Sequence, residues 1–86
     1  MQAVTIREAL PNDAEALERL AELDSSRPLR RPALVAEVGG ELWAAVSVAE
    51  RRVIADPFRP SGELGHLLSQ RAGQVAAQYT HVPAAA

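Results

Sequence analysis

The sequence contains no cysteine and no lysine, and its only aromatic residues are one Trp, one Tyr and one Phe. Without cysteine, disulfides, thiolate metal sites and thiol nucleophiles are excluded. Without lysine, Schiff-base chemistry on a lysine amine is excluded. The absence of cysteine fits a reducing compartment, so we expect a cytoplasmic protein.

Long apolar runs and an excess of positive charge are also missing. No stretch has the roughly 20 apolar residues that cross a bilayer. The first residues, Met1 to Arg7, have no basic segment followed by an apolar one, so we expect no signal peptide. The formal net charge is −2, which argues against nucleic-acid binding and against binding to anionic membranes.

The chain has 86 residues, of which 48% are hydrophobic, and this bounds it to one small domain. We expect that domain to cover residues 1–79, followed by a flexible tail over residues 80–86. Because the core is built almost entirely from Ala, Leu and Val, its stability margin is thin. A homodimer is therefore expected, since a dimer buries faces that the monomer cannot.

The first third of the chain predicts a strand, a helix and a loop. Val4–Ala9 alternates apolar and polar residues, as a strand does. Asn12 is a good N-cap, with Glu15 in the capping-box position, for a helix over Asp13–Leu23. The segment Asp24–Pro32 contains two prolines and three arginines and is predicted to be a solvated loop.

The middle of the chain predicts a β-hairpin. Two apolar runs, Ala33–Val38 and Glu41–Ala49, flank the Gly39-Gly40 pair, and both turn positions can take positive φ. Strict alternation would place Leu42 on the face of Ala44 and Trp43 on the other face. Neither face is polar, so we expect both sides of the sheet to be covered.

The last third predicts a strand, a corner and the longest helix. Val53–Ala55 is a short strand, and Phe58 is expected to pack under the corner that follows. Ser61 is the expected cap of a helix that runs to Tyr79, with an apolar stripe that begins at Leu64. The whole pattern predicts an α/β fold of the α+β type: a mainly antiparallel sheet of about four strands with two main helices.

In element order the chain resembles the N-terminal half of the GNAT superfamily of N-acetyltransferases. Val4–Ala14 resembles the opening strand and first helix of that family, and Val35–Val46 resembles its central hairpin. The segment Asp56–Leu68 stands where the acyl-CoA pyrophosphate loop and its helix belong. The resemblance also implies that the family's later strands have no counterpart here, which would leave Val53–Ala55 as a bare sheet edge.

The family loop reads Arg or Gln, two residues, Gly, one residue, then Gly or Ala. Arg59 and Gly62 match it, whereas Leu64 stands at the last position; a register shifted by one uses Gly65 instead. Pro60 removes one N–H from the loop. The resemblance thus implies Arg59, Gly62 and Gly65 as cofactor-binding residues.

Two functions from different classes follow. The first is a non-catalytic GNAT-like domain that acts through self-association or through a protein partner, with no cofactor. The second is an acetyl-CoA-dependent N-acetyltransferase whose site is completed by a second subunit, with Glu37 or Asp56 as the base that deprotonates the acceptor amine. His66 and His81 lack ligand partners at metal spacing, so no metal site is expected.

Overall fold

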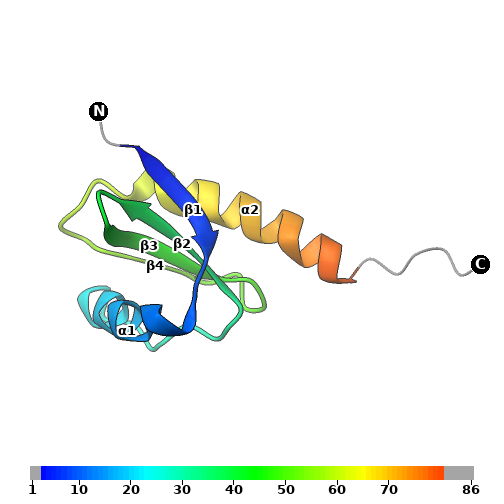
Figure 1. Cartoon of the computed structure of the whole chain (residues 1–86), viewed down its shortest axis with the longest axis horizontal. Helices are drawn as coiled ribbons and strands as arrows, with labels where there is room; N and C mark the ends of the chain where they lie inside the picture. Colours follow the sequence, from blue (N-terminus) through cyan, green and yellow to red (C-terminus); the bar gives the residue numbers. More distant parts are fainter. Residues whose placement is uncertain (1–2, 81–86) are drawn as a thin grey trace, which may run out of the picture.

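A computed structural model describes residues 3–80 of the chain, in one layer of sheet with a helix on each face (Figure 1). The elements, in chain order, are β1 (Val4–Glu8), a 3₁₀ turn (Pro11–Asp13), α1 (Ala14–Leu23), β2 (Ala33–Val38), β3 (Glu41–Ser47), β4 (Val53–Ala55) and α2 (Gly62–Thr80). The four strands are antiparallel to their neighbours and lie in the order β1-β2-β3-β4. This confirms the predicted fold class. Residues 81–86, most of the expected tail, lie outside the described residues.

Two glycines close the β2–β3 hairpin as the sequence predicts. Gly39 and Gly40 have φ values of 59° and 82°, which are the positive angles of a two-residue turn whose twist matches that of the strands. The strands on either side stay in register from Val38↔Glu41 inward.

A β-bulge at Trp43 makes the side chains at the start of β3 point to the opposite faces of the sheet from those predicted. Ala36 pairs with Ala44 and Glu37 pairs with Leu42, so Trp43 is an extra residue with no partner on β2. The bulge reverses the alternation: Trp43 packs on the same face as Ala44, and Leu42 packs on the opposite face. The prediction failed here because strict alternation assumes an unbroken ladder.

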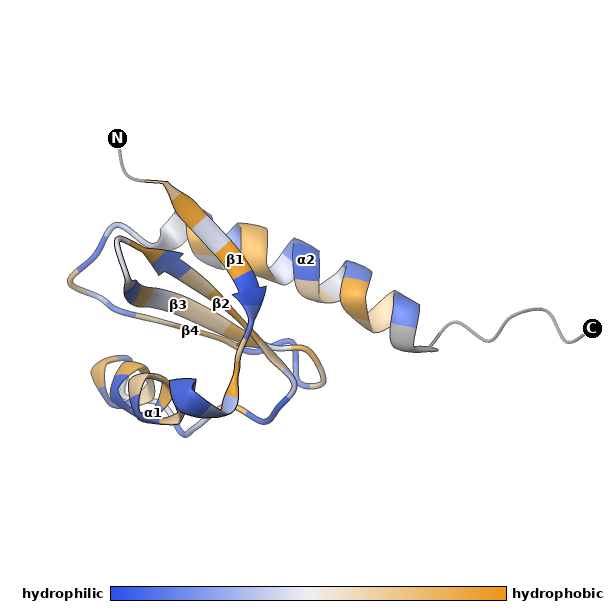
Figure 2. Ribbon diagram, in the orientation of Figure 1, coloured by the Kyte–Doolittle hydropathy of each residue, from blue (hydrophilic) through white to orange (hydrophobic). Residues whose placement is uncertain are grey.

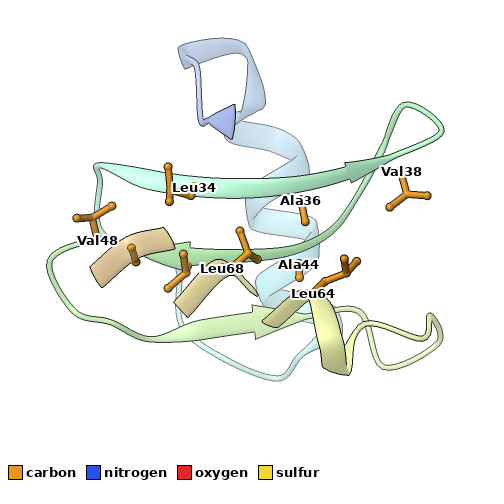
Figure 3. Packing of buried hydrophobic residues seen from close by; sticks show 9 residues of the cluster. Leu34, Ala36, Val38, Ala44, Val48, Leu64 and Leu68 are labelled. Atoms are coloured by element: carbon orange, nitrogen blue, oxygen red, sulfur yellow. The ribbon is translucent and has the colours of Figure 1, made fainter. Parts of the chain in front are cut away.

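Two separate clusters of apolar side chains cover the two faces of the sheet, and they confirm that both faces are buried. Figure 3 shows the cluster on the α2 face. The α2 face is the larger. Its buried members are Leu34, Ala36, Val38, Ala44, Val46, Val48, Leu64, Leu68 and Ala72. The α1 face consists of Leu17, Leu20, Ala21, Val35, Ala45 and Ile54. Figure 2 shows apolar and polar residues alternating along α2, as expected of a helix with one face on a sheet.

Helix α1 ends as predicted at Leu23 but begins one residue later than expected. Asn12 lies inside the 3₁₀ turn, and Asp13 takes the N-cap position. At the other end, Ser25 adopts a φ of 56°. The N–H of Ser26 donates to the Ala21 carbonyl at 2.8 Å and that of Ser25 to the Glu22 carbonyl at 3.0 Å. These two bonds define a Schellman motif with serine at the usual glycine position.

The corner between β4 and α2 departs from the prediction at Phe58. Its side chain is 82% exposed and does not pack under the turn. Leu64, by contrast, is buried as expected. Ser61 precedes the first residue of α2, but its hydroxyl donates back to the carbonyls of Asp56 at 3.2 Å and Arg59 at 3.3 Å. The serine therefore stabilises the turn between β4 and α2 by bonding to backbone carbonyls within it.

Strand β4 lies at the sheet edge, as expected, yet its outer side is not bare. The N–H of Ala55 points outward and makes a long 3.4 Å bond to Asp24 Oδ1. Arg52 donates to the carbonyls of Arg27 at 3.0 Å and Pro28 at 2.7 Å. The loop after α1 thus runs along β4 and covers part of its edge, which is a common protection of edge strands.

Candidate functional site

A hollow of about 440 Å³ lies between α1 and the turn end of the β2–β3 hairpin. It receives side chains from β1, α1, both hairpin strands and the corner after β4. Three of the five candidate residues from the sequence, Glu37, Asp56 and Arg59, line it together. Gly62 and Gly65 do not line it; they lie in the first turn of α2.

Arg7 and Asp13 form a polar pair with two hydrogen bonds in the hollow. Arg7 lies on the α1 face of β1, and its two terminal nitrogens donate to the Asp13 carboxylate at 2.8 and 3.0 Å. The backbone N–H of Leu10 donates to the same carboxylate at 2.7 Å. The Arg7 hydrogen bonds, followed by the Leu10 N–H, lower the pKa of Asp13 to about 2. The pair fixes the turn between β1 and α1.

Glu37 is the second partner of Arg7. Its carboxylate lies 3.5 Å from Arg7 Nε, and the two acids together raise the pKa of the guanidinium, with the Asp13 hydrogen bond as the largest cause. A carboxylate in this position balances a fixed cation. To act as a general base it would have to take a proton while Arg7 stays beside it.

Asp56 organises the corner after β4. Its Oδ1 accepts the N–H of Phe58 at 2.8 Å, which is an Asx turn. Its backbone N–H donates to the Trp43 carbonyl at 2.9 Å, and its carbonyl accepts from Arg59 N at 3.2 Å. Asp56 therefore ties the corner to the bulge on β3.

Arg59 is engaged by two groups of the hairpin. Its Nη2 lies 3.1 and 3.2 Å from the two carboxylate oxygens of Glu41. Its guanidinium carbon lies 5.4 Å from the centroid of the Trp43 ring, within cation–π range. The basic group expected to meet a pyrophosphate is already paired within the fold.

The first turn of α2 offers few free donors. Pro60 has no N–H, and the N–H of Gly65 donates to the Ser61 carbonyl at 3.0 Å. A Cβ at Gly65 would meet Val53 Cγ1 at 3.3 Å, whereas nothing lies within 4 Å of one at Gly62. Gly65 thus lets α2 pack closely on β4. The remaining first-turn N–H groups are those of Gly62, Glu63 and Leu64.

A second, smaller groove of about 260 Å³ lies on the α2 face, beside β1. It is lined mainly by apolar residues: Val4, Val38, Trp43, Pro60, Glu63 and Leu64. Trp43 borders both hollows, and its Nε1 is buried without a hydrogen-bond partner.

Sequence reasoning missed Arg7, Asp13 and the place of Trp43. Arg7 and Asp13 are separated by a proline-containing turn, so no helical or strand spacing links them. The only signal was that Arg7 shares a strand face with Thr5 and Ala9, which would direct it toward the first helix.

A scan against protein-family models found no match, and searches of curated proteins and of solved structures found no significant match. Within residues 3–80, no group of three His, Asp or Glu side chains could hold a metal ion. None of the described helices is long and apolar enough to cross a membrane.

Proposed function

We propose that this chain is a non-catalytic domain, built like the N-terminal half of a GNAT acetyltransferase, that acts by self-association or by binding a protein partner. One observation carries the proposal. Each charged group that would serve a transferase site already has a partner in the fold: Glu37 has Arg7, Asp56 has the N–H of Phe58, and Arg59 has Glu41. Recruiting them for catalysis would break these contacts.

The first test is a titration with acetyl-CoA by calorimetry. On this proposal no binding heat appears at millimolar ligand, because the Arg59 guanidinium is engaged and the first turn of α2 offers only three N–H groups. Light scattering at tens of micromolar protein, the range of weak dimers, is expected to show association. A clean monomer that binds acetyl-CoA tightly contradicts both statements.

One observation favours the second candidate, an acetyl-CoA-dependent N-acetyltransferase completed by a second subunit. Glu37 on β2 is far in sequence from Asp56 and Arg59 in the corner after β4, yet all three line the same hollow. In that function Arg59 leaves Glu41 to meet the pyrophosphate, and one of the two acids receives the proton of the acceptor amine.

A matched pair of variants separates the two candidates. Arg59→Ala removes the cation at the corner, while Arg27→Ala removes an exposed arginine outside the hollow. If the chain is a transferase, Arg59→Ala weakens acetyl-CoA binding about tenfold or more and Arg27→Ala does not. If neither the natural chain nor the Arg27→Ala variant gives binding heat with acetyl-CoA, the non-catalytic function stands.

A further inference from the structure

We propose that the outer edge of β1 is a self-association surface, on which β1 of a second copy pairs antiparallel about Ile6 and joins two sheets into one of eight strands. The inference deepens the proposed function, on which it rests, by naming the surface, the occupant and the register.

The hydrogen-bond pattern of the sheet shows which groups of β1 are open. The N–H of Ala9 donates to the Ala33 carbonyl at 2.8 Å. The register of the two strands places Ala9 directly opposite Ala33. Because bonded and non-bonded pairs alternate in an antiparallel ladder, Thr5 and Arg7 also bond to β2. The backbone groups of Val4, Ile6 and Glu8 therefore point to the outer side, where no described strand pairs with them.

The two edges of the sheet differ in protection. The β4 edge carries the Asp24 carboxylate and the loop held by Arg52. On the β1 edge, the contact that residues 3–80 make to an outward group is a long 3.3 Å hydrogen bond, which the Arg7 guanidinium donates to the carbonyl of Glu8. That bond uses one lone pair of the carbonyl and leaves the N–H groups free. Of the two edges, β1 is the one available for pairing.

Two large apolar side chains, one on β1 and one on α2, are left exposed by the monomer. Val4 is 45% exposed, and Leu67 on α2 is 48% exposed. Successive residues of an α-helix are rotated by about 100° about its axis. Leu67 and Gly65 therefore lie on opposite sides of the buried row formed by Leu64 and Leu68. A Cβ at Gly65 would meet Val53 of β4 at 3.3 Å, so Gly65 faces β4 and Leu67 lies on the side of α2 away from β4. Val4 and Leu67 thus add exposed apolar surface on the side of the molecule away from β4.

The occupant is a second copy because β1 complements itself in one register. Antiparallel pairing centred on Ile6 sets Ile6 against Ile6 of the second copy, Thr5 against Arg7, and Val4 against Glu8. No like charges meet, and all three outward residues form bonded pairs. Centring the pair on Arg7 would oppose two arginines, and centring it on Thr5 would leave Glu8 unpaired. The strand is short, so the dimer is weak, with a Kd on the order of tens of micromolar.

Two substitutions at Glu8 form the main test. The side chain is exposed, and the N–H points outward, so Glu8→Pro removes one outward donor per copy and leaves the β1–β2 ladder intact. Glu8→Ala removes the same side chain and keeps the N–H. Sedimentation equilibrium is expected to show the dimer dissociation constant raised about tenfold or more in Glu8→Pro, since two intermolecular bonds are lost, and nearly unchanged in Glu8→Ala.

Oxidative cross-linking locates the contact independently, because the chain has no cysteine of its own. Ile6→Cys places two thiols across the dyad in a bonded pair about 5.5 Å apart at Cα, within disulfide range. Ala55→Cys, on the β4 edge, is the control. A cross-linked dimer from Ile6→Cys and none from Ala55→Cys supports the proposal.

The outcomes separate this inference from the proposed function. A dimer that is insensitive to Glu8→Pro and cross-links through Ala55→Cys overturns the β1 surface, while self-association stands. A clean monomer for the natural chain up to millimolar concentration overturns the β1 surface and self-association together, and leaves partner binding as the remaining form of the proposed function. A dimer weakened equally by Glu8→Pro and Glu8→Ala overturns backbone pairing in favour of a side-chain contact.

Discussion

At the scale of single residues, the strongest polar feature is a pair that the chain uses for structure. Arg7 and Asp13 make two hydrogen bonds in fork geometry, and the Asp13 side chain is only 11% exposed. Such bidentate pairs are stronger than single contacts between exposed charges. The pair therefore connects β1 to the start of α1.

Removing the Asp13 charge is expected to lower stability in a pH-dependent way. The pKa of Asp13 falls from 3.8 unfolded to about 2 folded. A depressed carboxyl pKa contributes stability above pH 4, which is lost as the pH falls from about 4 to 2; the contribution is at most about 2 kcal/mol. Urea unfolding should show Asp13→Asn less stable at pH 7, with the gap closing toward pH 2.

The control for that experiment is Glu15→Gln, which removes an exposed acid in the first turn of the same helix. Its effect at pH 7 should stay within about 0.5 kcal/mol. An equal loss in both variants would mean that the net charge of α1, and not the Arg7 pair, supplies the stability.

At the scale of elements, the end of α1 is a place where the chain is less stable than it could be. Ser25 holds a φ of 56° in a Schellman motif that favours glycine. Ser25→Gly relieves that backbone strain, and the free energy of unfolding should rise by about 0.5–1 kcal/mol. The exposed Ser69 in α2 provides the contrast: Ser69→Gly should lower stability by about 0.5 kcal/mol. Thermal melts of the two variants should shift in opposite directions.

The contact between α2 and β4 gives a second prediction at this scale. A Cβ added at Gly65 would lie 3.3 Å from Val53 Cγ1. The substitution Gly65→Val, which adds a branched side chain there, should therefore lower the free energy of unfolding by about 1–3 kcal/mol through overpacking. Gly62→Ala projects into open space at the helix start and should be neutral or slightly stabilising. Chemical denaturation of both variants measures the difference. Equal losses would mean that the corner tolerates no side chain at all.

The sequence predicts the elements far better than their mutual contacts. Gly39-Gly40 specifies the hairpin because the turn needs a positive φ at two consecutive positions, which few residues besides glycine adopt. The bulge at Trp43 leaves no such local mark, since the extra residue is visible only against its partner strand. Phe58 is exposed because the Asp56 turn directs the chain outward there. The cover over β4 depends on Asp24, 31 residues away in sequence, and no periodicity links them.

The same limit applies to the candidate site. Glu37, Asp56 and Arg59 could be singled out by residue type, and they do line one hollow. The partners of Glu37 and Arg59 could not be foreseen, because Arg7 and Glu41 come from other segments of the chain that the fold brings close. Partners in the fold, more than residue types, decide whether such groups are available for chemistry.

At the scale of the whole molecule, the monomer has two thin cores of small side chains on a single sheet. A fold of this size gains much from any further apolar burial. If two copies associate, binding is linked to folding, and the melting temperature rises with protein concentration. Between roughly 10 and 500 µM we expect an increase of a few degrees by differential scanning calorimetry.

The matching control for the concentration series is Glu8→Pro. Its melting temperature should stay nearly constant across the same range, because the outward N–H that pairs the two copies is gone. A natural chain with a flat profile would argue against association in solution.

The only tryptophan of the chain, Trp43, borders both hollows of the molecule and carries the Arg59 cation over its ring. Its intrinsic fluorescence is therefore a built-in optical reporter. An occupant of either hollow, or the departure of Arg59, changes the polarity around one indole, and the emission shifts without any added label. Ligand screening, dimer formation and unfolding can all be followed through this single residue.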